Sequence, residues 1–215
     1  MPLQNRVTPF GDLIAVPERG SMFGNRGVLH DPQRRIVRYS QGRRWLICRL
    51  AFRNRRRTIM RPGSYTELFF LDEATALAAG HRPCAECRYR EYQDFRRCWA
   101  TVHASASGTL PSADQMDAHL HQDRLAAPGS RKTYRDDIAA LADGVFIVHE
   151  GEAWLLWQSA LLHWTPGGYD QCRARPTRGH VMVLTPRATA RTIAAGYRPG
   201  VHPSALLGEE TGGAM

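Results

Sequence analysis

The residues best suited to chemistry are two cysteines spaced as Cys-x-x-Cys, directly after a proline. They are Cys84 and Cys87, preceded by Pro83. A turn of this kind brings two thiolates to one point, and the spacing is typical of zinc sites. The chain has five cysteines in all, an odd number at uneven spacing, and its first residues do not read as a signal peptide. We therefore predict a metal site with reduced cysteines and not a disulfide framework.

A second set of polar residues could act on a substrate. Asp117 and His121 lie at positions i and i+4 of a predicted helix, so they share one of its faces. A carboxylate and a histidine placed together could orient and deprotonate a water molecule for attack on a phosphodiester or an N-glycosidic carbon. The alternative is a solvated contact on the helix surface.

A third candidate is the glycine-bracketed loop over 24–31. Glycines let a backbone approach a ligand closely, so Asn25 could read a base edge or hold a water molecule, and His30 could polarise a leaving group. Arg26, in the same loop, could contact a phosphate. The alternative is an ordinary turn in which Asn25 has a left-handed conformation.

Arginine dominates the charge of the chain. The formal net charge is +9 at pH 7, and Lys132 is the only lysine. Many arginines lie between Arg34 and Arg61, and such a patch is typical of nucleic-acid binders. A GC-rich genome would explain arginine in place of lysine but not the excess over Asp and Glu. We predict DNA, either intact or with damaged or modified bases, as the partner.

The order of motifs from Leu46 to Cys87 adds a comparison. The residues are Leu46-Ile47-Cys48-Arg49-Leu50-Ala51-Phe52-Arg53-Asn54-Arg55-Arg56, then Glu67-Leu68-Phe69-Phe70, an alanine-rich stretch from Asp72 to Gly80, and His81-Arg82-Pro83-Cys84-Ala85-Glu86-Cys87. This segment resembles the Ada metal-binding domain, the zinc domain of bacterial alkylation-repair regulators. That family has a cysteine pair, a basic stretch, a Phe-Phe strand end, an alanine-rich helix with Gly-Phe-Arg-Pro, and a closing Cys-x-x-Cys.

The resemblance implies a zinc site and its ligands. Cys48, Cys84 and Cys87 match three of the four thiolates of the family, whereas Phe52 stands at the place of the other. His81, where the family has phenylalanine, would complete a tetrahedral set of one nitrogen and three sulfur ligands. Four protein ligands would make the zinc structural, because no position stays open. An imidazole in place of a thiolate lowers the negative charge of the site, so the resemblance supports DNA binding more than methyl transfer to Cys48.

A basic stretch follows the first cysteine, where the family has its own. It consists of Arg53, Arg55, Arg56 and Arg57. Arginine forms bidentate hydrogen bonds with phosphate oxygens, so we predict that these side chains contact the DNA backbone.

Periodicity and turn signals predict the elements that would position these residues. Strands are predicted over 35–39, 44–50, 67–71, 145–149, 153–157 and 181–184, and helices over 72–79, 89–103, 113–125 and 185–195. Asp72 is the predicted N-cap of the first helix, and Gly80 ends it. Tyr92, Phe95 and Trp99 recur at helical spacing and predict a buried face on the second helix.

These elements predict an α+β fold, with a small Ada-like zinc module followed by a β-rich α+β part. The predicted organisation is a loop-rich amino-terminal segment over 1–43, the zinc module over 44–103, the carboxy-terminal part over 113–207 and a disordered tail over 208–215. No apolar run approaches the roughly 18 residues that would span a bilayer. We therefore expect a cytoplasmic protein that does not bind membranes; its oligomeric state stays open.

The expected function is DNA repair or modified-base processing by a zinc-containing hydrolase that excises a base or cuts a strand. One alternative is a non-enzymatic zinc-stabilised DNA-binding regulator or adaptor. Another is an HNH-like nuclease with His119 or His121 as its base, although its usual Asp-His dipeptide is absent. A zinc deaminase would need a His-x-Glu upstream of the cysteines, which the chain lacks. Without His81 as a ligand the metal would have an open position, and metal-activated water becomes possible.

Overall fold

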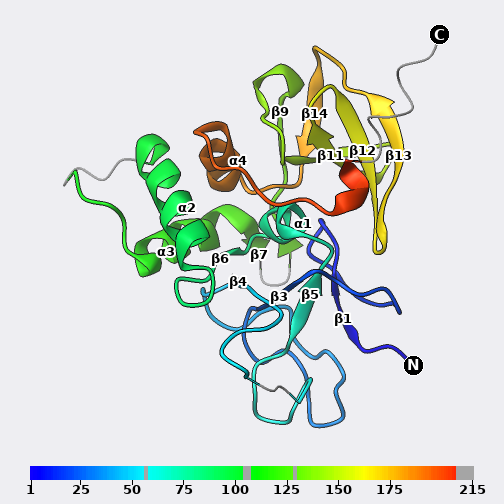
Figure 1. Ribbon diagram of the computed structural model, residues 1–215, viewed down its shortest axis with the longest axis vertical. Coiled ribbons are helices and arrows are strands. Elements are labelled where there is room, and N and C mark those ends of the chain that lie inside the picture. The colour runs from blue at the N-terminus through cyan, green and yellow to red at the C-terminus, as the bar shows by residue number, and fades with distance from the viewer. Residues whose placement is uncertain (56–57, 104–107, 128–129, 207–215) are drawn as a thin grey trace.

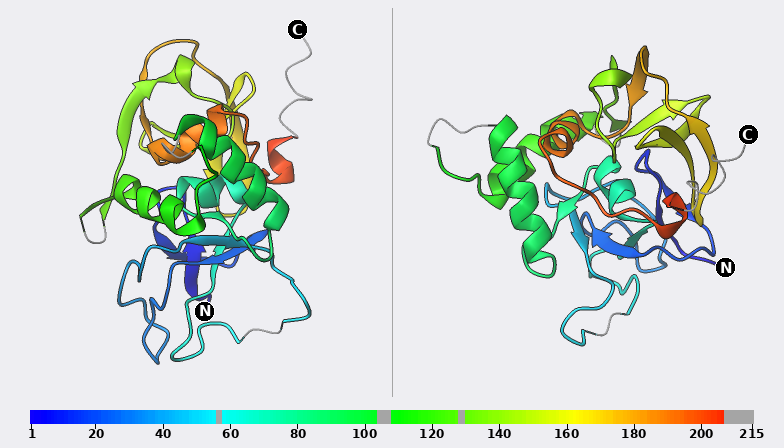
Figure 2. Two further views of the ribbon diagram at one scale, coloured as in Figure 1. Left: turned by 90° about the vertical axis from the view of Figure 1, so that its left-hand side faces the viewer. Right: turned by 45° about the horizontal axis from the view of Figure 1, so that its top comes forward.

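A computed structural model describes residues 1–55, 58–103, 108–127 and 130–206 of the chain. Within these residues the fold is α+β, as predicted, and two six-stranded sheets dominate it. In Figure 1 the first sheet lies in the lower half and the second at the upper right, with helix α1 (Glu73–Ala78) between them. The two views in Figure 2 show the same arrangement from other directions. The helix between the sheets therefore contacts both halves of the chain.

The first sheet is built from the amino-terminal strands, in the order β2-β1-β5-β3-β4-β6. These strands are β1 (Gln4–Val7), β2 (Leu13–Ala15), β3 (Met22–Asn25), β4 (Leu46–Cys48), β5 (Leu68–Phe70) and β6 (Arg82–Pro83). Strands from the predicted segment 1–43 thus share one sheet with strands from the predicted zinc module. The strand predicted over 35–39 is reduced to one bridge between His30 and Ile36, because Asp31 and Arg35 close a tight turn there.

Local signals place the helices close to their predicted positions. The carboxylate of Asp72 accepts a backbone N–H from the first turn of α1 at 2.8 Å, as expected of an N-cap. Gly80 follows the helix with a φ of 87°, a left-handed conformation that favours glycine. Helix α2 (Tyr89–Val102) buries its predicted aromatic stripe. The other helices are α3 (Ala113–Arg124), α4 (Arg187–Ala194) and short 3₁₀ helices over Ile138–Ala140 and Pro203–Ala205.

The second sheet has the order β13-β12-β11-β10-β14-β9, and its neighbouring strands are antiparallel. Its strands are β9 (Tyr134–Asp137), β10 (Phe146–His149), β11 (Glu152–Trp157), β12 (Ala160–Thr165), β13 (Gly168–Ala174) and β14 (His180–Val183). A separate pair joins β7 (Leu125–Ala127) to β8 (Ser130–Arg131). The sequence predicted β10, β11 and β14 but missed β9, β12 and β13.

One hydrophobic core joins the two sheets. It contains Ile47 and Leu77 from the amino-terminal half, Trp99 from α2, and Ile147 and Ile193 from the carboxy-terminal half. The core therefore runs across the predicted boundary between the zinc module and the carboxy-terminal part, and the predicted tail over 208–215 lies outside the described residues. Among the described residues, no helix combines the length and the apolar character needed to cross a membrane.

Candidate metal centre

Three cysteines meet at one end of β4. Cys48 is the last residue of that strand, whereas Cys84 and Cys87 flank the turn between β6 and α2. The parallel pairing of β4 with β6 brings them together, and the backbone N–H of Cys84 donates to the carbonyl of Ile47 at 2.9 Å. The three sulfur atoms lie within 4.8 Å of one another, and all three residues are buried. The predicted cysteine set is therefore assembled at a distance at which one ion can bind all of it.

The three thiols hydrogen-bond to one another. Bonds from Cys48 and then from Cys87 lower the pKa of Cys84 to about 2. The backbone N–H of Glu86 also donates to the Cys84 sulfur, at 3.4 Å. The bond to Cys84 conversely raises the pKa of Cys48 well above its ordinary value. One thiolate is thus favoured and a second is disfavoured next to it, so full deprotonation requires a cation that offsets the repulsion.

His81 does not belong to this cluster. Its side chain is fully buried between Trp45 and Phe70, with ring centroids 5.3 Å and 4.8 Å away. Neither ring nitrogen has a hydrogen-bond partner among the described residues. Burial, and then the charges of three nearby arginines, hold the pKa of His81 well below its ordinary value, so the ring is neutral. The predicted fourth ligand is therefore a core residue in this structure, and the described residues bring three candidate ligands together.

An aromatic shell surrounds the cysteines. Phe23 is buried against them, and Phe52 and Phe69 pack there as partly buried residues. Phe52 stands where the Ada-like pattern has a cysteine. Its side chain packs against the cluster and offers no metal ligand. An apolar shell of this kind limits the access of water and strengthens electrostatic interactions inside it.

The basic stretch after β4 lies next to the cluster. The guanidinium groups of Arg53 and Arg55 lie over the Phe52 ring at 5.0 Å and 5.5 Å from its centroid. Both pair with Glu86, at 3.8 Å and 2.6 Å, and both are largely exposed. Exposed arginines are thus held beside the cysteine turn; their contact with phosphate stays a prediction. Arg56 and Arg57 lie outside the described residues.

Arg26 does not reach the surface, contrary to its predicted role in DNA binding. Its side chain is 0% exposed and lies over the rings of Tyr39 and Trp45, 4.0 Å and 4.9 Å from their centroids. One of its nitrogens donates to the carbonyl of Gly11 at 2.9 Å. A guanidinium group enclosed in this way supports the fold and cannot contact a phosphate.

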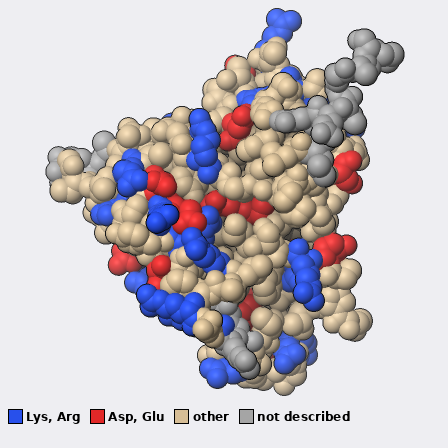
Figure 3. Space-filling model, viewed as in Figure 1, with Lys and Arg blue, Asp and Glu red and all other residues tan. Residues whose placement is uncertain are grey.

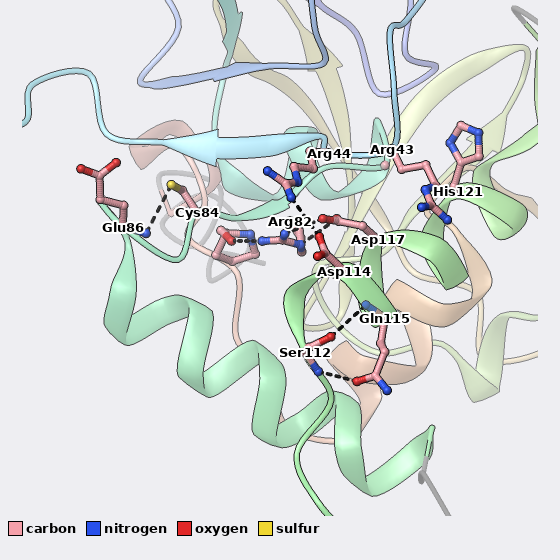
Figure 4. Close-up of polar contacts among 12 residues, drawn as sticks. Arg43, Arg44, Arg82, Cys84, Glu86, Ser112, Asp114, Gln115, Asp117 and His121 are labelled. Atoms are coloured by element: carbon pink, nitrogen blue, oxygen red, sulfur yellow. Dashed lines mark hydrogen bonds and ion pairs between the residues drawn. The ribbon is translucent and has the colours of Figure 1, made fainter.

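Asp117 and His121 do not form the predicted acid–base pair. Both carboxylate oxygens of Asp117 accept bonds from Arg82, at 2.8 Å and 2.6 Å, and both side chains are almost fully buried. His121 instead lies 3.5 Å from a nitrogen of Arg124. Figure 4 shows Asp117 turned toward Arg82, whereas His121 lies beside Arg43. Both residues do lie on one helix, α3, as predicted. However, the carboxylate of Asp117 is paired with Arg82 of β6 and not with His121.

The loop over 24–31 has no candidate catalytic geometry. Asn25 is the last residue of β3, paired with Leu46. His30 is buried, and its ring nitrogens contact the Thr66 hydroxyl at 2.6 Å and the Arg61 carbonyl at 3.3 Å. With both nitrogens engaged in the fold, His30 has none free to polarise a leaving group.

A histidine–aspartate pair in the second sheet was not predicted. Nδ1 of His163 lies 2.6 Å from a carboxylate oxygen of Asp170. The register shifts opposite His163 and Trp164, leaving Asp170 as the extra residue of β13, and such bulges re-aim side chains. His163 and Trp164 line a hollow of about 520 Å³ together with Phe10. No sequence motif marks the bulge, so the pair could not be found from the sequence.

No family model matches the chain, and comparisons with curated proteins and with solved structures give no match. The candidate function therefore rests on the site itself: three buried thiols close enough to bind one metal ion, next to exposed arginines.

Proposed function

We propose that the protein binds zinc through Cys48, Cys84 and Cys87 and that it binds DNA. The observation that carries the proposal is the meeting of three buried sulfur atoms within 4.8 Å. Thiolates are soft ligands that select zinc, copper(I) or iron–sulfur clusters over magnesium and calcium. The resemblance to the Ada metal-binding domain favours zinc among these.

The place of the arginines supports the second half of the proposal. The loop with Arg53 and Arg55 begins directly after Cys48 and pairs with Glu86, which lies between the other two cysteines. A metal ion bound by the three cysteines would fix the start of the arginine loop next to the turn that contains Glu86. Exposed ion pairs contribute only about 0–1 kcal/mol, so both guanidinium groups can exchange Glu86 for phosphate oxygens at little cost.

Basic side chains also gather around this region on the surface. Figure 3 shows Lys and Arg along the lower-left edge of the face drawn, near the lower end of α2 and the loop after β4. Arg49, which directly follows Cys48, pairs with Glu91 of α2 at 3.4 Å. Contacts of this kind position a protein on the DNA backbone without reading its sequence.

A hydrolytic repair enzyme is the second candidate, and one observation favours it. The described residues supply three ligands, the number found in catalytic zinc sites, whereas structural sites have four. A zinc ion held by three residues would supply Lewis acidity at its open position. Incubation with oligonucleotides carrying alkylated, oxidised, deaminated and hydroxymethylated bases, followed by mass spectrometry of the DNA and the protein, tests this candidate. A lost base or a cut strand would support it, and unchanged DNA would contradict it for these substrates.

The zinc half of the proposal is tested by elemental analysis. We expect one zinc ion per chain in the wild type and in Cys172→Ser, because Cys172 is exposed and lies outside the cluster. Cys84→Ser should lose the metal. Equal zinc contents in the two variants would contradict the assigned ligands.

The DNA half is tested by fluorescence anisotropy with a labelled duplex at several salt concentrations. Chelation of zinc should weaken binding. The double variant Arg53→Ala/Arg55→Ala should lower the slope of log K against log [salt] by about 2, since each phosphate contact contributes about 0.9. The control is Arg19→Ala/Arg178→Ala, which removes two exposed arginines that have no ion pair among the described residues. Binding that is equally strong in both double variants would refute the assigned contacts.

A further inference from the structure

A hollow of about 860 Å³ opens beside the carboxy-terminal end of α3. The loop over 38–43 forms one wall, and the end of α3 with β7 forms the other. None of the described residues that line it is Asp or Glu. Its polar and charged lining includes Arg38, Tyr39, Arg43, His121, Gln122 and Lys132.

The two arginines of the hollow form no ion pair with any residue that the structure describes. Arg44, just outside it, pairs with Asp114 at 3.2 Å, whereas neither Arg38 nor Arg43 has a carboxylate within ion-pair distance in the described part of the chain. Both are exposed. The ammonium group of Lys132 donates to the carbonyl of Gln122, another lining residue, at 2.6 Å. The hollow thus presents three cationic side chains to solvent and no acidic one.

A layer of buried guanidinium groups lies behind this wall. Arg124 is 0% exposed, and its guanidinium group lies over the Trp45 ring, 4.0 Å from the ring centroid. The guanidinium group of Arg26 lies over the Tyr39 ring at the same distance. Neither forms an ion pair among the described residues, and Arg26 Nε and Nη1 and Arg124 Nε have no hydrogen-bond partner there. Charges in a low-dielectric interior are weakly screened, so these groups add positive potential to the hollow.

His121 reports on this potential. Burial, and then the charges of Arg124 and Arg43, lower the pKa of His121 below its ordinary value of 6.5. Arg38 and Lys132 line the same hollow. An anion in the hollow would offset these cations and raise the pKa of His121, so the ring can be used as a probe of anion binding.

We propose that this hollow binds phosphate groups of a nucleic-acid backbone. The position supports this source, because Figure 4 shows Arg43 and His121 at one end of β4 and Cys84 with Glu86 at the other. From Arg43 to Arg49 the chain can extend over at most about 20 Å, the length of roughly six base pairs. One nucleic-acid strand lying along β4 can therefore contact the hollow and the arginines beside the cysteines. This inference rests on the proposed DNA binding and adds a second contact to it.

The test compares two double variants in zinc-loaded full-length protein. Arg38→Ala/Arg43→Ala should lower the salt slope of DNA binding by about 2, at about 0.9 per phosphate contact. Arg19→Ala/Arg178→Ala, with the same change in net charge, should leave the slope nearly unchanged. If both variants weaken binding equally while the wild type binds, the hollow is not a phosphate site and the proposed function stands.

A second readout separates the source of the phosphate. Histidine NMR titrations should show that duplex DNA raises the pKa of His121 in the wild type and not in Arg38→Ala/Arg43→Ala. If inorganic tripolyphosphate raises it and DNA does not bind, the hollow takes a free polyphosphate, and the nucleic-acid source is overturned together with the proposed function. If neither anion changes the pKa of His121, the inference is refuted.

Discussion

Replacing Asp117 with Asn should destabilise the protein strongly, because Asp117 neutralises a buried arginine. Arg82 donates to both carboxylate oxygens, and the two side chains are only 3% and 2% exposed. The Arg82 guanidinium group also donates to the carbonyl of its neighbour Pro83 at 3.0 Å and lies 5.5 Å from the centroid of the Tyr92 ring. Neither supplies a negative charge, so Asp117→Asn leaves an uncompensated guanidinium group in the interior.

The expected loss is large on the scale of a single substitution. Removing one partner of a buried ion pair costs about 3–5 kcal/mol. For a chain of this size each kcal/mol lowers the melting temperature by about 2–4 °C, so a drop of roughly 6–20 °C is expected. Circular dichroism during thermal unfolding measures it. Arg82 directly precedes Pro83 and Cys84, so part of the loss should appear as weaker zinc retention.

Asp114→Asn is the matched control for Asp117→Asn. Asp114 lies on the same helix and pairs with Arg44 at 3.2 Å, but the two side chains are 74% and 73% exposed. Exposed pairs contribute about 0–1 kcal/mol, so the melting temperature should change little. Removing both buried charges with Arg82→Met/Asp117→Leu should cost less than Asp117→Asn alone. Equal effects of Asp114→Asn and Asp117→Asn would refute the assignment of Asp117 to the fold and reopen a role in catalysis.

Two further substitutions probe buried groups near the cysteines. The His81→Phe variant should retain zinc. Its free energy of unfolding in a urea titration should be equal to or higher than that of the wild type, because an unsatisfied buried polar group costs about 1–3 kcal/mol. Loss of zinc in this variant would instead support His81 as a ligand. Since the folded pKa of His81 is lowered, the unfolded chain binds this proton first, and wild-type stability relative to His81→Phe should fall below pH 6.5 by up to about 1.4 kcal/mol per pH unit. Glu73 accepts bonds from Arg88 at 2.8 Å and 2.9 Å and from the Tyr197 hydroxyl at 2.6 Å, so Glu73→Gln should cost about 3–5 kcal/mol in thermal unfolding. Glu152→Gln, at an exposed position, is the control. A loss of stability of the same size in this control would show that the buried bonds of Glu73 do not cause the effect.

The parts of the fold that depend on local signals were predictable from the sequence. Asp72 and Gly80 bound α1 because capping and left-handed conformations are properties of single residues. The aromatic spacing on α2 predicted its buried face for the same reason. The cysteine cluster was also predictable, since the motif order placed Cys48 beside the Cys-x-x-Cys turn before any contact was known.

The missed features depend on partners that are distant in the sequence. His81 and Cys84 are separated by the strand β6, where successive side chains point to opposite faces, so residues at i and i+3 diverge. Helical spacing correctly predicted that Asp117 and His121 share a face, but it could not show that Arg82 binds the carboxylate. The pair of His163 with Asp170 needs a bulge between two strands, and only their register reveals it.

The excess of arginine has a different meaning in the interior and on the surface. Arg82 and Arg88 are buried but neutralised by carboxylates, so they add nothing to the potential outside. Arg26 and Arg124 are buried and form no ion pair among the described residues, and we propose that their field reaches solvent where the fold opens beside α3. Counting arginines in the sequence therefore predicts the sign of a partner's charge but not where the partner would bind. We propose that the place of contact depends on buried cations that lack an ion pair. Among the described residues Arg26 and Arg124 lack one, and both lie behind the hollow that contains Arg43.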